Sequence, residues 1–179
     1  MRIIGGAWRR RVLRFPDALA LRPTPDRVRE TLFNWLGQDL TGLTCLDLFA
    51  GSGALGFEAA SRGAARTVLV EQAPAVAAAL RDNAKNLAMD RVEVVRADAL
   101  QFAASTRDRF DVILLDPPYR QGWLERIVPH LDRIAGDRAL VYAEAEHPVE
   151  TLGAWAAVRQ GRAGQVYYQL LQREARDAG

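Results

Sequence analysis

The chain has 179 residues, of which 49% are hydrophobic and 26% charged, and its net charge is +2. This length and composition fit one globular domain with a substantial core and exclude an intrinsically disordered chain. We see no signal peptide and no apolar run near ~18 residues, so we expect a cytoplasmic protein without membrane contact. Because the chain has one cysteine and no cluster of metal ligands, we also expect no disulfide and no metal site.

Positive charge is concentrated at the N-terminus. Residues 1–36 contain eight arginines and three acids, so this segment carries +5 and the remainder −3. A basic arm on a weakly acidic body indicates a polyanionic partner, and a solvated basic surface is the alternative. Arg9, Arg10 and Arg11 have planar side chains suited to phosphates and bases. We therefore expect these three arginines to contact a nucleic acid.

The same segment has a predicted order of elements. Residues 1–21 are expected to form a short β-hairpin or extended arm, followed by a helix to about Leu36 with one apolar face. Thr24 is the expected N-cap of that helix and Pro25 its first residue, since both residue types are common at those positions.

A glycine turn follows the first predicted strand. Residues 43–53 indicate a strand, a Gly51-Ser52-Gly53 turn and then a helix from about Ala54 to Ser61. This order is typical of the opening of a nucleotide-binding βαβ unit, in which glycines let the backbone approach a ligand. An ordinary strand-to-helix turn is the alternative.

Acids follow the next two predicted strands. Glu71 ends the apolar run at 67–71 and lies 20 residues beyond Gly51, the spacing expected for an acid that binds ribose hydroxyls. Asp98 follows the run at 92–96 and is placed to accept a hydrogen bond from an adenine amine. Each acid taken alone could equally be a solvated strand end.

The glycine turn also limits the type of ligand. It lacks the third glycine of the dinucleotide fingerprint and the Gly-Lys-Ser/Thr of a P-loop, and the chain has a single lysine, Lys85. An adenosine ligand without phosphates therefore fits better than NAD or ATP, and S-adenosylmethionine is such a ligand. Asp47 could hold its methionine amino group, directly or through water.

The most informative stretch is 110–119, Phe-Asp-Val-Ile-Leu-Leu-Asp-Pro-Pro-Tyr. Its apolar run predicts a buried parallel strand that ends where α/β proteins bind ligands. Asp116 and the Pro117 carbonyl can accept both N–H groups of a nucleobase amine, which frees the nitrogen lone pair and stabilises the positive charge that grows during attack. Tyr119 can stack on the base, an interaction worth about 1–3 kcal/mol. A strand that ends in a proline turn with a surface tyrosine is the alternative.

Together the apolar runs predict an α/β fold. Strands are expected near 44–48, 67–71, 92–96, 110–115 and 139–144, with an antiparallel hairpin of 154–160 and 165–172 at the end. The result is a seven-stranded, mostly parallel sheet whose last strand is antiparallel.

These motifs resemble S-adenosylmethionine-dependent methyltransferases of the Rossmann-like class I fold. More closely, they are similar to the RsmD family, bacterial enzymes that methylate N2 of a guanine in 16S rRNA. The resemblance covers nearly the whole chain and is carried by blocks at residues 2–6, 22–36, 47–56, 58–59, 61–62, 116–119, 164–166 and 172–174.

The resemblance implies an RNA-binding extension at 1–36 and a methyltransferase domain at 37–179. It also implies S-adenosylmethionine as cofactor and, as substrate, a specific guanine of 16S rRNA within a 30S or pre-30S particle. The expected cofactor-binding residues are Asp47, Gly51, Ser52, Gly53, Glu71, Asp98 and Ala99. The expected catalytic residues are Asp116, Pro117 and Tyr119, and the expected RNA-binding residues are Arg9, Arg10, Arg11 and Arg22.

Two alternatives stay open at this point. An amino methyltransferase acting on adenine N6 or cytosine N4 of DNA or RNA would share the Asp-Pro-Pro-Tyr motif, but the N-terminal blocks disfavour it. A non-catalytic RNA-binding module would need no cofactor, and the acids at 47, 71, 98 and 116 count against it.

Overall fold

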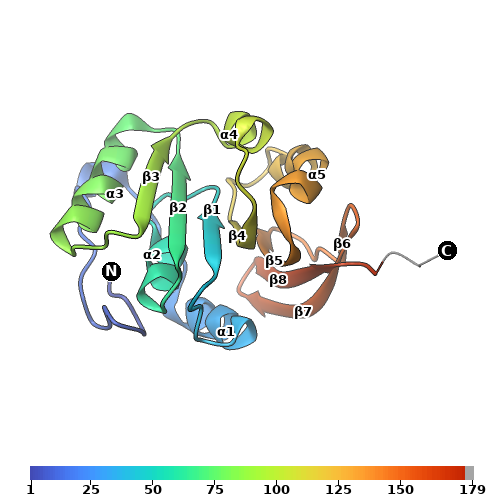
Figure 1. The fold of residues 1–179 in the computed structure, drawn as a ribbon, viewed down its shortest axis with the longest axis horizontal. Helices are drawn as coiled ribbons and strands as arrows, with labels where there is room; N and C mark the ends of the chain where they lie inside the picture. Colours follow the sequence, from blue (N-terminus) through green and yellow to red (C-terminus); the bar gives the residue numbers. More distant parts are fainter. Residues whose placement is uncertain (176–179) are drawn as a thin grey trace.

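The computed structural model describes residues 1–175, which form an eight-stranded sheet with helices on both faces (Figure 1). The helices are α1 (Asp26–Leu36), α2 (Ala54–Ser61), α3 (Pro74–Asn86), α4 (Ala99–Ser105), α5 (Trp123–Ile134) and the short 3₁₀ helix η1 (Asp17–Leu19). The strands are β1 (Thr44–Asp47), β2 (Arg66–Glu71), β3 (Val92–Arg96), β4 (Phe110–Leu115), β5 (Ala135–Ala145), β6 (Thr151–Leu152), β7 (Trp155–Ala163) and β8 (Val166–Arg173). The predicted α/β fold is confirmed, and the two-residue strand β6 is an addition at the sheet edge.

The order of strands places the ligand site. The sheet runs β3-β2-β1-β4-β5-β8-β7-β6, with parallel pairing from β3 to β5 and antiparallel pairing beyond it. Strands β1 and β4 are neighbours although β2 and β3 lie between them in the chain, so the winding direction reverses there. Open α/β sheets bind ligands outside the carboxyl ends of the strands at such a point. The ends of β1 and β4 are therefore the expected place for the site.

The core consists of layers on the two faces of this sheet. One face packs against α4 and α5, which bury apolar side chains such as Ile127 and Leu131. The other face packs against α1, α2 and α3, with Leu32 and Phe57 among the buried residues. Within residues 1–175, no helix has the length and apolar character needed to cross a membrane.

The N-terminal arm, residues 1–21, lies along α2 and α3 (Figure 1). The hairpin expected here is reduced to a single antiparallel bridge between Arg2 and Val12. Ile3 and Leu13 are buried in the cluster that α2 and α3 form. Because it contributes to this core, the arm is packed into the fold and its path is fixed.

A buried carboxylate anchors the arm. Glu58 lies in α2, all eight residues of which are buried, and it accepts the backbone N–H groups of Ile4 and Gly5 at 3.0 and 2.8 Å. It also pairs with Arg62 at 3.0 Å and with Arg29 at 3.5 Å. A buried charge needs such partners. Arg29, one of the eight arginines of the basic segment, is thus buried and serves the fold.

The start of α1 differs from the sequence prediction. The helix begins at Asp26 with Pro25 as its N-cap, and no side chain caps it. Thr24 is buried, and its side chain instead faces the carboxylate of Asp116, where it lowers the pKa of that group. The predicted N-cap was wrong because a tertiary contact takes the Thr24 side chain away from the helix end.

Candidate active site

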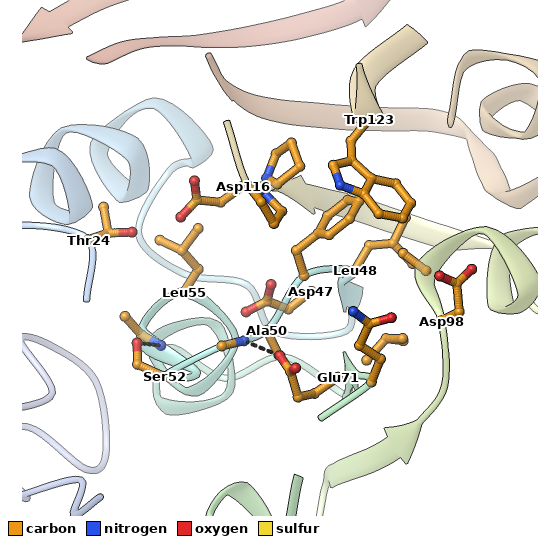
Figure 2. Close-up of a pocket in the computed structure, with 18 of the residues that line it drawn as sticks. Thr24, Asp47, Leu48, Ala50, Ser52, Leu55, Glu71, Asp98, Asp116 and Trp123 are labelled. Atoms are coloured by element: carbon orange, nitrogen blue, oxygen red, sulfur yellow. Dashed lines mark hydrogen bonds between the residues drawn. The ribbon is translucent and has the colours of Figure 1, made fainter. Parts of the chain in front are cut away.

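A cavity of about 380 Å³ opens at the carboxyl ends of β1 to β4 (Figure 2). Small-molecule sites span about 300–1,000 Å³, so this cavity has room for a cofactor-sized ligand. Residues that the sequence predicted as functional make up much of its lining: Arg22, Asp47, Gly51, Ser52, Glu71, Asp98, Ala99, Asp116 and Pro117.

The turn between β1 and α2 forms one wall. Gly51 and Gly53 have φ of 52° and 76°, which L-residues with a side chain rarely adopt. A Cβ on Gly53 would press on the Phe57 side chain, so this glycine serves the core and does not line the cavity. Gly56 was not predicted, yet a Cβ there would overlap Leu69 of β2. It therefore permits the close helix–strand packing that the third glycine of the dinucleotide fingerprint provides.

Acids at the ends of β2 and β3 bind backbone amides. The two carboxylate oxygens of Glu71 accept the N–H groups of Gly51 at 2.9 Å and Ala73 at 3.1 Å. Asp98 caps α4 by accepting the N–H of Gln101 at 3.1 Å. Each carboxylate oxygen has a further lone pair, so both acids can still accept hydrogen bonds from a ligand in the cavity.

Asp47 lines the cavity between Asp116 and Glu71 (Figure 2). It is 1% exposed and accepts the N–H of Gly56 at 3.0 Å. Burial raises the pKa of Asp47 to about 7, and the negative charges of Asp116 and Glu71 add to the rise, while the Gly56 bond opposes it. A cationic group of a ligand would therefore keep this carboxylate charged at neutral pH.

Asp116 follows the last residue of β4 and is held from two sides. Thr24 faces it from the segment before α1 (Figure 2), and Glu144 of β5 hydrogen-bonds to it. Burial raises the pKa of Asp116, while the bonds from Glu144 and Thr24 oppose the rise. Neither Thr24 nor Glu144 carries a local sequence signal that points to Asp116.

Aromatic side chains lie at the mouth. Tyr119 is 47% exposed and lines a neighbouring hollow with Pro118 and Glu144, outside the main cavity. Trp123, at the start of α5, does line the cavity and meets Phe49 edge to face with ring centroids 5.4 Å apart. The site thus has one exposed ring near its entrance and a second aromatic wall that the sequence did not predict.

The predicted RNA-binding arginines lie in two places. Arg22 lines the cavity. The exposed arginines at 9–11, hereafter the arm tip, adjoin the far end of α2, where the N–H of Ala7 donates to the carbonyl of Ser61 at 2.8 Å. Since α2 begins at the cavity with Ala54, its length of about 12 Å separates the arm tip from the site.

The described residues, 1–175, contain no group of three or more His, Cys, Asp and Glu side chains arranged to hold a metal ion. The lining of the cavity is instead a set of carboxylates, backbone amides and aromatic rings.

Comparison with known sequences places the chain among relatives of similar length. The model of the family described as Conserved hypothetical protein 95 matches residues 1–172. Ribosomal RNA small subunit methyltransferase D of Escherichia coli strain K12 is 46% identical over 98% of this chain and 91% of that protein. The protein of the same name from Haemophilus influenzae is 39% identical over 96% of this chain and 93% of its own length.

Solved structures agree with these matches. The putative methyltransferase yhhF from Escherichia coli superposes with a TM-score of 0.88 at 45% identity, covering 98% of this chain and 99% of its own. An RNA methyltransferase from Salinibacter ruber, in complex with S-adenosyl-L-homocysteine, has a TM-score of 0.69 at 22% identity and covers 87% of this chain and 97% of its own. The second likeness shows a shared Rossmann-like fold.

Proposed function

The chain belongs to the family described as Conserved hypothetical protein 95 and is a methyltransferase, and on this premise we propose that it transfers a methyl group from S-adenosylmethionine to N2 of a specific guanine in 16S rRNA. The relatives named as small subunit ribosomal RNA methyltransferases support this choice of RNA. The observation that carries the chemistry is the position of Asp116 and Pro117 in an acid-lined cavity at the end of β4.

The cavity fits an adenosine ligand with a cationic amino acid part. Glu71 would accept from the ribose hydroxyls, Asp98 from the adenine amine, and Asp47 would face the methionine ammonium group. Arg22 is the single cation among the lining residues, so a nucleoside triphosphate would find few partners for its phosphates. When bound, S-adenosylmethionine supplies a methyl group activated by a sulfonium.

The backbone at Gly51, Ser52 and Ala99 completes this proposed site. Gly51 and Ser52 belong to the turn that Glu71 holds in place, and Ala99 opens α4 directly after Asp98. The ligand would therefore lie across the ends of β1, β2 and β3, with its reactive end toward β4. Trp123 supplies an apolar wall on that side (Figure 2).

Asp116 and Pro117 act on the guanine amine. The amine is a poor nucleophile because its lone pair is delocalised into the ring. A carboxylate and a carbonyl that accept its two hydrogens localise that lone pair and stabilise the positive charge that develops on nitrogen. Thr24 fixes the Asp116 carboxylate before the base arrives, so little reorganisation is needed during the reaction. Tyr119, exposed beside the mouth, is available to stack on the incoming base.

The basic segment is the proposed RNA contact. Residues 1–36 would form the RNA-binding extension and 37–179 the methyltransferase domain. The chain runs from the arm tip to Arg22 at the cavity. A folded RNA could therefore contact the arm tip and Arg22 together, while one base is turned out of its stack into the site. We propose a 30S or pre-30S particle as the substrate, because RNA held in a particle can present one base in a fixed geometry.

The test compares RNA substrates. Unmodified 16S rRNA, free or in 30S particles, is incubated with the protein and S-adenosylmethionine, and nucleosides are mapped by mass spectrometry. We expect N2-methylguanosine at one position, formed faster in particles and more slowly, by about 10²-fold or more, with the Asp116→Asn variant. N6-methyladenosine or N4-methylcytidine would reassign the base, and a failure to bind S-adenosylmethionine in calorimetry would favour a non-catalytic RNA-binding module.

The arm tip is tested separately. Replacing Arg9, Arg10 and Arg11 with Ala should weaken RNA binding and flatten its log–log salt dependence by about 0.7 to 0.9 for each phosphate that the variant no longer neutralises, with cofactor affinity unchanged. A matched control removes the same charge from three exposed arginines elsewhere, Arg107, Arg138 and Arg159. Equal salt slopes for the two triple variants would contradict an RNA contact at the arm tip.

A further inference from the structure

A buried acid of β5 lies beside the proposed reaction centre, and none of the steps above uses it. Glu144 is 6% exposed, and the hydroxyl of Tyr142 donates to its Oε1 atom at 2.7 Å. It also lines the hollow that holds Tyr119. An acid so deeply buried needs a reason, because an uncompensated carboxylate in such a place is strongly unfavourable.

The strand register explains its position. Strands β4 and β5 are parallel and pair Leu114 with Tyr142 and Leu115 with Ala143. The next residues along the chain are Asp116, directly after β4, and Glu144, still within β5. Paired residues of parallel strands point to the same face of a sheet, so the two carboxyl groups are brought together at the carboxyl edge. Each carboxyl group accordingly shifts the pKa of the other.

Two buried carboxyl groups on neighbouring strands disfavour each other's charged form, so one of them is expected to keep a proton at neutral pH. We propose that Glu144 is a positioning residue, which keeps a proton and donates it in a hydrogen bond to Asp116. Asp116 then stays anionic, with its orientation fixed by Glu144 on one side and Thr24 on the other. This inference rests on the proposed function of the site and adds a residue to it.

The electrostatics assign the proton to Glu144. Burial and then the negative charge of Asp116 raise the pKa of Glu144 to about 9, while the bond from Tyr142 opposes the rise. Asp116 receives hydrogen bonds from both Glu144 and Thr24, which favour its charged form. Asp47 and Tyr142 act on Glu144 directly. Around them, Tyr168 acts on Tyr142, and Tyr119 is influenced by the pair and by Glu146.

Two variants separate the donated hydrogen bond from the carboxyl group itself. Glu144→Gln keeps a donor toward Asp116 and an acceptor for Tyr142 but cannot ionise. Glu144→Leu removes the donor. Single-turnover methylation of 16S rRNA is measured from about pH 7 to about pH 10, and S-adenosylmethionine affinity is measured by calorimetry in parallel. Glu150→Gln, an exposed acid further along the chain, is the matched control.

In the parent protein, we expect the rate to fall above about pH 9 as Glu144 ionises beside Asp116. Glu144→Gln should keep the neutral-pH rate within about threefold and lose that decline, whereas Glu144→Leu should be about 10- to 100-fold slower, the loss expected for a missing hydrogen bond to a charged group. Cofactor affinity should be equal in all four proteins. The inference would be overturned if the rate of Glu144→Gln declined at high pH as the parent's does. It would also be overturned if Glu144→Gln were as slow as Glu144→Leu.

A second measurement needs no RNA. The ¹³C chemical shift of the Glu144 carboxyl, assigned by its loss in Glu144→Gln, reports its ionisation directly. We expect a midpoint near 9, and a midpoint near the ordinary glutamate value of about 4.3 would refute the inference. If the carboxyl titrates near 9 but the parent protein methylates no guanine, the proposed function fails while the shared proton stands.

Discussion

Acids at one edge of the sheet fall into two groups with different surroundings. Glu71 and Asp98, at the ends of β2 and β3, are partly exposed and accept backbone N–H groups. Asp47 on β1, Asp116 directly after β4 and Glu144 on β5 have raised pKa values, chiefly through desolvation. The first group suits neutral hydroxyl and amine donors. The second group is desolvated, so its charged forms are favoured by a ligand group that carries or develops positive charge.

The largest effect is expected at Asp116. Asp116→Asn keeps the shape and one acceptor oxygen but removes the charge proposed to stabilise the developing cation. The single-turnover methylation rate should fall about 10²-fold or more, matching the roughly 2.7–4 kcal/mol of a deleted electrostatic stabiliser. RNA and cofactor affinities should change much less, since the charge acts mainly in the transition state. A parental rate with both ligands bound would remove Asp116 from the mechanism.

A smaller effect is expected in the first group. Glu71→Ala should weaken S-adenosylmethionine binding about 10- to 150-fold, because the absence of a charge-assisted hydrogen bond corresponds to about 1.5–3 kcal/mol. Calorimetry on the folded protein measures this directly. Glu71→Gln is the control, since it keeps one acceptor oxygen, and it should lie between the parent and Glu71→Ala. Equal affinities for all three proteins would exclude a ligand contact at Glu71.

The third test concerns stability and pH. Because the pKa of Asp47 is raised from 3.8 to about 7 in the folded state, the folded protein keeps a proton that the unfolded chain has released between these values. The free energy of unfolding therefore decreases as pH rises from about 4 to 7. Asp47→Asn removes this penalty and keeps an acceptor for Gly56.

Without cofactor, Asp47→Asn should unfold at a higher temperature than the parent above pH 7, by roughly 10 °C. A rise of the pKa from 3.8 to about 7 corresponds to about 4 kcal/mol, and ~1 kcal/mol corresponds to about 2–4 °C in a chain of this size. The difference should vanish toward pH 4. Calorimetric Tm values across this range measure it. Parallel Tm curves for the two proteins would show that Asp47 ionises in the folded state as an ordinary acid does.

The parts of the fold that local patterns encode were predictable. The strand, turn and helix at 43–61 and the apolar run at 110–115 formed as predicted, because burial on both faces of a parallel strand leaves a plain apolar signal. The family resemblance is confirmed. Strand β6 was missed because two residues carry no periodicity. The roles of the individual cofactor and RNA contacts stay predictions.

The remainder of the site depends on distant contacts. Thr24 matches a helix cap by sequence, and only the packing of α1 against β4 shows that it bonds Asp116. Glu144 looks like an acid near a strand end, and its role depends on the β4–β5 register. Gly56 and Glu58 lie within an apolar helix pattern, where a glycine and an acid look like imperfections until Leu69 and the arm are placed around them.

The anchoring of the arm by Glu58 affects how the chain is made and how it can be cut. During synthesis the arm emerges first, but its partner lies 53 residues beyond Gly5, so the arm docks only after α2 has formed. Leaving a buried charged group without a hydrogen-bond donor is destabilising by about 1–3 kcal/mol or more. Deleting the arm would therefore produce a folding defect that imitates a loss of RNA binding, and only point substitutions at the arm tip can separate the two.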